Sequence, residues 1–193
     1  MTLTQPNPVL DFMLTRRSKP AAALHSPAPD AEALERLLTA AARVPDHGKL
    51  EPWRFLVIQG AALERLSALV RERGTATGVE PEKVEKSALN WARAPMIVAV
   101  VASPKPSDKV PPFEQLLSAG AVCLSLVNAA LGSGWGAAWI SGWAAFDRDF
   151  VERGLGLGAQ EQIAGFIHLG TCDIAAPERP RPVVSALTQW VSE

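Results

Sequence analysis

The hydrophobic positions of residues 30–45 recur at i, i+3, i+4 and i+7, which is the spacing of one buried helix face. Asp30 precedes this pattern at the position of an N-cap, and Pro45 ends it because the residue before a proline is disfavoured in helical backbone. The pattern predicts an amphipathic helix followed by a loop that begins at His47. The apolar positions are Leu34, Leu37, Leu38 and Ala41.

Residues typical of helix ends predict three further helices. Their expected ranges are Asn7–Ser18, Ala61–Arg73 and Pro81–Trp91. Glycine favours the end of a helix, so Gly74 is expected to stop the second of these. The outer positions of the third carry mixed charges, including Lys83 and Lys86, which we interpret as an ordinary solvated face.

Apolar runs rich in β-branched residues predict the strands. Met96–Ala102 is apolar at every position, which marks a central strand covered on both faces. The other expected strands are Arg54–Ile58, Ala137–Gly142 and Gln162–Leu169.

The stretch from Phe113 to about Leu131 is apolar nearly all round and rich in alanine and glycine. Such a helix must be buried, either inside the domain or between subunits, and its small residues permit close packing of another helix. We favour the subunit interface. The tail from Val183 to Val191 is also apolar and has little left to cover it in its own domain. We therefore expect this tail to dock on a partner chain.

Composition narrows the functional classes. The chain has 193 residues, enough for one domain, and a formal net charge of -1, which argues against nucleic-acid binding by phosphate neutralisation. The N-terminal residues lack the apolar run of a secretory signal or membrane anchor. Cys123 and Cys172 lie far apart, and the three histidines have no carboxylate cluster beside them. We therefore expect a cytoplasmic protein without a metal site.

Two arginines and a hydroxyl stand together where the first helix ends. Arg16, Arg17 and Ser18 suit a phosphate monoester, because guanidinium groups bind phosphate oxygens with paired charge-assisted hydrogen bonds. The alternative is a basic helix end that interacts favourably with its own dipole. Arg43 is either a second contact over the loop at His47 or a surface arginine.

The loop from Pro45 to Trp53 is both polar and stiff. His47 can donate from a ring nitrogen to a carbonyl or ribityl oxygen, although a loop histidine with purely local partners would look the same. The sequence contains neither a GxSxG elbow nor a Walker loop, so hydrolysis has no visible nucleophile. The glycines of Gly132–Gly136 follow a helix, the reverse of the order in a dinucleotide-binding loop.

Six motifs follow one another between about residue 10 and residue 175. They are RRS, ARVPDHGKLEPWRFLVI, an apolar strand preceded by RAP, KVPPFEQLLSAG, GWGAAWISG and GFIHLGT. In this order they resemble the FMN-dependent nitroreductase family, in particular its short minimal subgroup with a PDH loop and a WRS-like turn.

The resemblance implies an α+β fold, a three-layer αβα sandwich with a mixed, mostly antiparallel sheet. It also implies an intertwined homodimer with one FMN at each subunit interface, formed by a single domain over residues 1–193. Residues 176–193 would be an extension that packs on the partner subunit. The activity would be hydride transfer from NADH or NADPH through flavin N5 to a nitro compound or another electron-poor small molecule, in a ping-pong sequence.

Site residues follow from the resemblance position by position. No side chain is expected to be catalytic, since the flavin performs the chemistry. The turn of residues 130–135 would lie near the nicotinamide donor; it comprises Ala130, Leu131, Gly132, Ser133, Gly134 and Trp135. The expected FMN contacts are Arg16, Arg17, Ser18, Arg43, His47, Lys49, Trp139, Ile140 and Ser141. Alternatives are a flavin-dependent reductase of activated carbonyls or enones and a non-catalytic FMN-binding protein.

The chain departs from the family pattern at three places. Lys49 and Glu51 stand in the stretch where many relatives have N-x-Q-P-W, and a lysine near the flavin pyrimidine would raise the reduction potential by stabilising the anionic reduced form. Ile140 replaces the arginine of the WRS-like turn. Larger relatives place basic residues near the C-terminus on the phosphate, and Arg179 and Arg181 are the candidates here.

Overall fold

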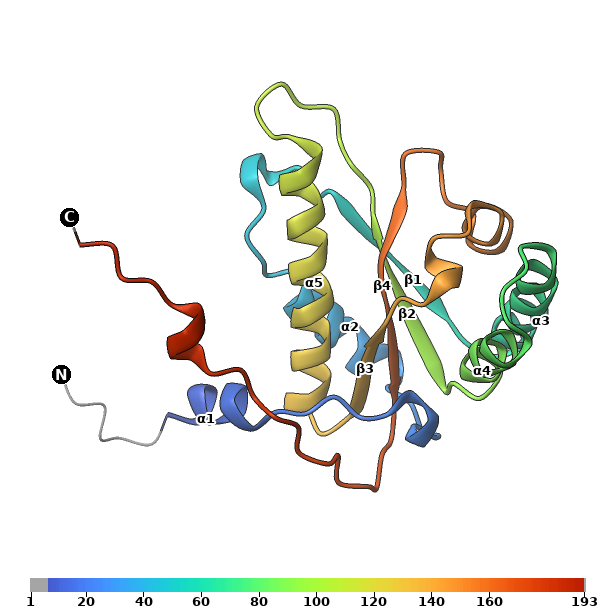
Figure 1. Cartoon of the computed structure of the whole chain (residues 1–193), viewed down its shortest axis with the longest axis horizontal. Coiled ribbons are helices and arrows are strands. Elements are labelled where there is room, and N and C mark those ends of the chain that lie inside the picture. The colour runs from blue at the N-terminus through green and yellow to red at the C-terminus, as the bar shows by residue number, and fades with distance from the viewer. Residues whose placement is uncertain (1–6, 193) are drawn as a thin grey trace.

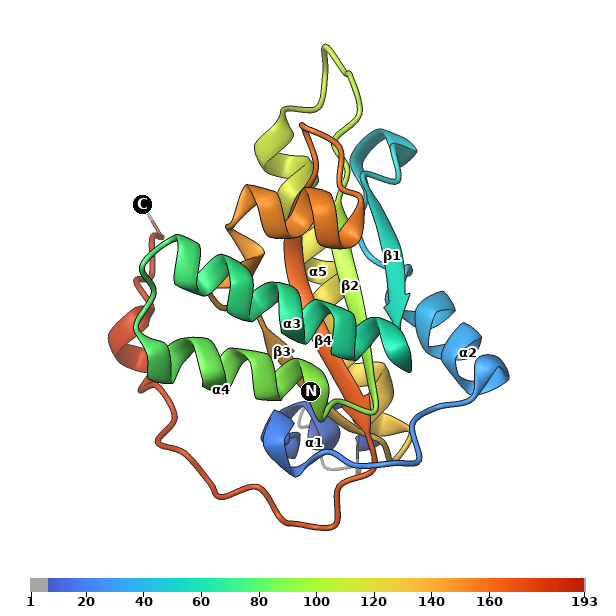
Figure 2. The ribbon, with the colours of Figure 1, turned by 90° about the vertical axis from the view of Figure 1, so that its right-hand side faces the viewer.

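A four-stranded sheet lies between two helical layers in the computed structural model, which describes residues 7–192 (Figure 1). Helices α2 and α5 cover one face of the sheet, and α3 and α4 cover the other (Figure 2). The expected three-layer α+β sandwich is therefore confirmed. All strand pairs are antiparallel among the described residues, in the order β1-β2-β4-β3. The strands are β1 (Trp53–Ile58), β2 (Met96–Ala102), β3 (Gly136–Ile140) and β4 (Gln162–Gly170).

Strand β2 is the centre of the hydrophobic core, as its continuous apolar run predicts. Every residue of β2 is buried, because α2 and α5 cover alternate side chains on one face and α3 and α4 cover those on the other. Val98 lies opposite Val57 of β1 and Ile167 of β4. The strand order places β1 and β3 at the two edges of the sheet, with β3 beside β4.

The helices begin where the sequence signals place them, but two of them end elsewhere. The first ends at Thr15, so residues 16–18 lie beyond it. The third continues past Gly74, which was wrongly expected to stop it. A Cβ atom at Gly74 would lie 2.5 Å from a methyl carbon of Val84, so this glycine permits the close crossing of two helices. The helices are α1 (Pro8–Thr15), α2 (Ala31–Ala41), α3 (Ala61–Ala76), α4 (Pro81–Ala92) and α5 (Pro112–Gly132).

Short helical turns connect these elements. Asp147 begins one of them by accepting a hydrogen bond from the backbone N–H of Phe150 at 2.7 Å. The turns are η1 (Ala21–Ala23), η2 (His47–Lys49), η3 (Trp143–Ala145), η4 (Phe150–Gly154) and η5 (Val184–Leu187).

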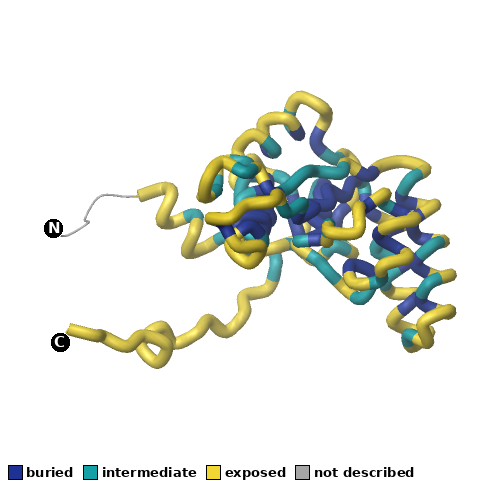
Figure 3. The backbone as a smooth tube through the Cα atoms, turned by 90° about the horizontal axis from the view of Figure 1, so that it is seen from above, coloured by how far each residue is buried: buried dark blue, intermediate teal, exposed yellow. Residues whose placement is uncertain are grey.

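Helix α1 and the C-terminal tail extend away from the three layers on the side of α5 (Figures 1 and 3). None of the residues of α1 is buried, and Trp190 in the tail is 90% exposed. Their apolar side chains have almost no cover within the described chain.

Helix α5 is, among the residues described, the one helix long and apolar enough to cross a membrane by length and composition. Its inner face packs on the sheet through buried side chains, among them Val122 and Leu126, as a core helix does. Its outer face exposes Phe113, Leu117 and Leu124. Only half of α5 is therefore covered by the chain itself.

Candidate functional site

Helix α1 directs two arginines to the open edge of the sheet. Asn7 caps the helix by accepting a hydrogen bond from the backbone N–H of Leu10 at 3.1 Å. After the helix ends, the backbone N–H of Lys19 donates to the carbonyl of Ala137 in β3 at 2.9 Å. Because β3 is an edge strand, this bond fixes residues 16–18 beside an accessible rim of the sheet.

These residues line a cavity of about 400 Å³, which we call the arginine cavity. The C-terminal tail contributes two more arginines to it, and Trp139 of β3 also lines it. Four of the expected FMN contacts, Arg16, Arg17, Ser18 and Trp139, are therefore brought together. The full lining is Arg16, Arg17, Ser18, Lys19, Pro20, Trp139, Ala176, Pro177, Arg179 and Arg181.

The arginine cavity has the electrostatics of an anion site. The Nε atoms of Arg16 and Arg17 are buried and have no hydrogen-bond partner within residues 7–192. Burial lowers the pKa of Arg16, and the positive charges of Arg181 and Arg17 lower it further. A bound anion would accept hydrogen bonds from the unpaired donors and would reduce the repulsion between the neighbouring positive charges. The donor set therefore fits the phosphate of FMN, which the resemblance implies.

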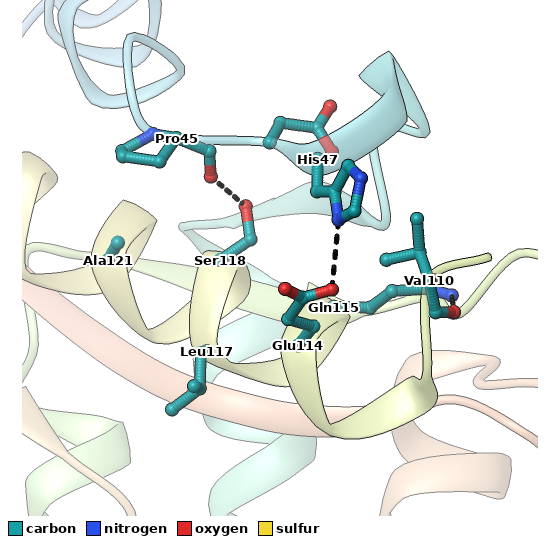
Figure 4. A pocket seen from close by; sticks show the side chains of 9 residues that line it. Pro45, His47, Val110, Glu114, Gln115, Leu117, Ser118 and Ala121 are labelled. Atoms are coloured by element: carbon teal, nitrogen blue, oxygen red, sulfur yellow. Dashed lines mark hydrogen bonds and ion pairs between the residues drawn. The ribbon is translucent and has the colours of Figure 1, made fainter.

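The loop that contains His47 forms a second cavity, of about 320 Å³, against the first turns of α5 (Figure 4). His47 Nδ1 lies 3.0 Å from Glu114 Oε2. The hydroxyl of Ser118 donates to the carbonyl of Pro45 at 2.8 Å and accepts from the indole N–H of Trp53 at 3.2 Å. Helix α5 thus holds the loop from below, and His47 stays 60% exposed at its side chain.

The backbone of this loop is unusual. Gly48, Lys49 and Glu51 have φ values of 75°, 53° and 47°, a region that residues with a Cβ atom rarely adopt. The carboxylate of Asp46 holds the turn by accepting from the backbone N–H groups of Leu50 at 3.2 Å and Glu51 at 2.8 Å. Strained backbone of this kind is concentrated at functional sites. The backbone N–H of Lys49 donates to the carbonyl of Asp46 at 3.2 Å, while its side chain is exposed and makes no hydrogen bond with another described residue.

The arginines and the histidine loop lie at opposite ends of α5 within one chain. Glu114 contacts His47, whereas the other end of the helix, at Gly132, lies against Phe12 of α1. These two positions are about 27 Å apart at 1.5 Å per residue. A single chain therefore does not bring His47 and Lys49 to the arginine cavity. Arg43 is exposed in the turn after α2 and also lies outside that cavity.

Ile140 and Ser141 line a third cavity, of about 200 Å³, on the other side of the end of β3, which we call the α4 cavity. One face of α4 lines it with Lys83, Lys86, Ser87 and Asn90. Lys83 and Lys86 are exposed, as the sequence interpretation of a solvated face predicted, and the same face also lines this cavity. Positions 83, 86, 87 and 90 follow helical spacing, which is the signal that a common polar surface was present.

A buried histidine in β4 also lines the α4 cavity. His168 is 3% exposed, and its Nδ1 has no hydrogen-bond partner within the described part of the chain. The indole Nε1 of Trp143, which lines the same cavity, is likewise buried and unpartnered there. Burial lowers the pKa of His168 to about 4, so its ring is neutral near pH 7. The α4 cavity therefore offers hydrogen-bonding groups to the polar part of a ligand, whether that part is uncharged or anionic.

The turn expected near the nicotinamide donor joins α5 to β3. Ala130 is buried in α5, while Ser133 and Gly134 are exposed. Gly134 has a φ of 86°, which reverses the chain into the edge strand. Because α1 contacts Gly132, this turn lies at the same end of α5 as Arg16 and Arg17.

Comparisons with known proteins give a single family. The family model described as "Nitroreductase family" matches residues 14–171. The chain is 38% identical over 167 residues to "Putative NAD(P)H nitroreductase YdjA" of Escherichia coli (strain K12), covering 86% of this chain and 90% of that protein.

Solved structures show the same fold at lower sequence identity. A nitroreductase-like family protein from Bacillus cereus superposes with a TM-score of 0.81 at 21% identity, covering 100% of both chains. A nitroreductase with bound FMN from Bacteroides fragilis NCTC 9343 gives a TM-score of 0.73 at 21% identity, covering 97% of this chain and 100% of that one. The extent of the family match and the sequence identity to the relative from Escherichia coli show that the chain belongs to the nitroreductase family of oxidoreductase enzymes.

Proposed function

We propose that this protein is an FMN-dependent NAD(P)H oxidoreductase of the nitroreductase type that reduces nitro compounds or other electron-poor small molecules. The arginine cavity carries the proposal, because the buried Nε atoms of Arg16 and Arg17 lack partners within the described residues and Trp139 also lines the cavity. A flavin mononucleotide combines the anion that this cavity favours with a large planar ring. The family match and the FMN-bound structure of the same fold support this choice of anion.

The flavin would lie across the end of β3. Its phosphate would be held by Arg16 and Arg17, and its ring would lie near Ile140 and Ser141, where the strand passes from the arginine cavity to the α4 cavity. The pyrimidine edge of a flavin has both donors and acceptors, which match the amide of Asn90 and the neutral imidazole of His168. These two residues are additions to the contacts predicted from the sequence.

The protein would act as a homodimer that shares each site. A two-fold axis that packs the exposed stripe of α5 against its copy in antiparallel orientation places the first turn of one helix beside the last turn of the other. His47 and Lys49 of one subunit would then approach the flavin site of its partner. This arrangement resolves the separation of the two half-sites within one chain, and it covers Phe113, Leu117 and Leu124. Of the extension of residues 176–193, the part beyond residue 181, which includes the 90% exposed Trp190, would pack on the partner subunit.

The chemistry that FMN supplies when bound is two-electron transfer from NADH or NADPH to the acceptor. The protein binds and orients the reactants. The arginines anchor the phosphate, Lys49 places a positive charge near the pyrimidine, and residues 130–135 lie at the end of α5 where the donor would approach. Lys49 would raise the flavin reduction potential, because a nearby positive charge stabilises an anion.

A visible absorption spectrum of the purified protein tests the proposal directly. We expect flavin bands, and we expect NADH or NADPH to bleach them under anaerobic conditions. A colourless protein whose melting temperature does not respond to added FMN would end the proposal. Bound flavin that neither nucleotide bleaches would instead indicate a non-catalytic FMN-binding protein, and a screen of oxidants with the reduced enzyme would separate nitro compounds from enones.

Replacing Arg16 and Arg17 together by alanine tests the assignment of the phosphate site. We expect the affinity for FMN to fall more than about 100-fold, since two sets of charge-assisted hydrogen bonds are lost. Arg36→Ala on the exposed face of α2 is the matched control and should leave the affinity unchanged. Equal flavin content in the double variant and the control would contradict the assignment.

A further inference from the structure

The C-terminal tail is tied to the exit of α1 by two long-range hydrogen bonds. The ammonium group of Lys19 donates to the carbonyl of Ile174 at 2.9 Å. The guanidinium of Arg17 donates through Nη2 to the carbonyl of Pro177 at 2.8 Å. These bonds hold the segment of residues 174–181 across the mouth of the arginine cavity.

This segment brings a carboxylate to the arginine cluster. Glu178 Oε1 accepts from Nε of Arg181 at 2.9 Å and from the backbone N–H of Arg179 at 3.1 Å, and it lies 3.7 Å from Nη1 of Arg17. The Arg179 N–H and the Arg181 guanidinium lower the pKa of Glu178, so the side chain is a carboxylate near pH 7. Its charge therefore offsets part of the positive charge of the cavity.

The carboxylate is held loosely compared with the arginines that it contacts. The Glu178 side chain is 67% exposed, whereas that of Arg17 is 19% exposed. An exposed ion pair contributes little to stability, because water and salt screen it. A phosphate dianion carries more charge and three acceptor oxygens, so it competes effectively for the same guanidinium groups.

We propose that Glu178 is an internal counter-anion of the arginine cavity, which an incoming phosphate displaces, and that it thereby lowers the affinity of the protein for phosphorylated flavin. This inference rests on the proposed FMN site and adds a residue that opposes binding there. Glu178 would act on FMN and on inorganic phosphate, and it would not act on riboflavin, which lacks the phosphate group.

The variant Glu178→Gln tests the inference because it keeps the side-chain size and removes the charge. With full-length protein stripped of flavin, in phosphate-free buffer, we expect the dissociation constant for FMN to fall about three- to tenfold, the size expected for one charge near an exposed phosphate. Riboflavin should bind equally well to the variant and to the unmodified protein. Flavin fluorescence quenching measures both constants.

Glu85→Gln is the matched control, since Glu85 forms an exposed ion pair with Arg71 of α3 and lines neither the arginine cavity nor the α4 cavity. It should change neither affinity. Unchanged or weaker FMN binding in Glu178→Gln would overturn the inference, and so would an equal gain for riboflavin.

A second measurement separates this inference from the proposed function. Added inorganic phosphate should raise the melting temperature of Glu178→Gln more than that of the unmodified protein, whether or not either binds flavin. If the unmodified protein binds no FMN, the proposed function fails, and the phosphate measurement still decides the role of Glu178. Equal responses to phosphate would overturn the counter-anion role.

Discussion

The two helical layers of this protein meet the solvent in different ways. The outer side of α3 and α4 carries exposed ion pairs, such as Arg71 with Glu85 and Lys83 with Glu80. The outer side of α5 instead presents apolar side chains, with Phe113 69% exposed and Leu117 56% exposed. A contiguous apolar surface of this kind usually marks an interface. The layer of α3 and α4 therefore presents a polar outer surface, whereas the layer of α5 leaves apolar side chains uncovered within the described chain, on the face of the proposed dimer.

A charge on the α5 stripe should have the largest effect. We expect Leu117→Glu to weaken the proposed dimer by about 3 to 5 kcal/mol, because a carboxylate would be buried without a partner at the interface. Sedimentation velocity would show monomers, and FMN affinity would fall with the loss of the shared site. Ala68→Glu on the exposed face of α3 is the control and should stay dimeric. If Leu117→Glu remains dimeric, the stripe is not the interface.

A cavity in the layer of α3 and α4 should lower the stability of the fold and leave the proposed dimer intact. Leu66 of α3 is 0% exposed, so we expect Leu66→Ala to lower the free energy of unfolding by about 3 kcal/mol. Denaturant unfolding measures this loss, and the oligomeric state should not change while the protein is folded. Loss of the dimer in folded Leu66→Ala would contradict the independence of the two layers.

The smallest of the three effects is a pH dependence of the free energy of unfolding that comes from the buried His168. The pKa of His168 is about 4 in the folded protein and about 6.5 in an unfolded chain. The unfolded state therefore binds the proton more readily, and stability present above pH 6.5 is lost as the pH falls toward 4. Between pH 7 and pH 5 this loss amounts to about 2 kcal/mol.

His168→Phe should remove that part of the pH dependence. The measurement is the difference between the free energies of unfolding at pH 7 and at pH 5. An effect of the substitution that is equal at both pH values cancels in this difference. A variant with the same loss as the unmodified protein would show that His168 is not the titrating group.

Local sequence signals predicted the elements well where one physical cause dominates. Met96–Ala102 was predicted with its observed bounds, because a strand covered on both faces has no polar position. Asp30 caps α2 as predicted, by accepting from the backbone N–H of Ala33 at 2.8 Å. Gly74 was misread, since its closeness to Val84 depends on a neighbouring helix that the local sequence does not show.

The candidate site was harder to predict than the fold. The motif order identified Arg16, Arg17, Ser18 and Trp139, which the structure gathers in one cavity. Asn90 and His168, which line the α4 cavity, were not predicted, because an amphipathic pattern shows which side of a helix is polar and does not show what lies opposite. The separation of His47 from the arginines within one chain was also hidden, since sequence motifs do not indicate which end of α5 each segment packs against.

The sequence by itself determined the order of helices and strands, the central strand, the apolar character of α5 and the family. The helices and strands depend on periodicity and capping, which involve residues close together in the chain. The family follows from the order of the motifs along the sequence. Only the tertiary structure decided that the arginines after α1 meet those of the tail, that Glu178 contacts Arg17 and Arg181, and that His47 is held at the far end of α5. Such contacts join residues far apart in the chain, and they depend on how the layers pack.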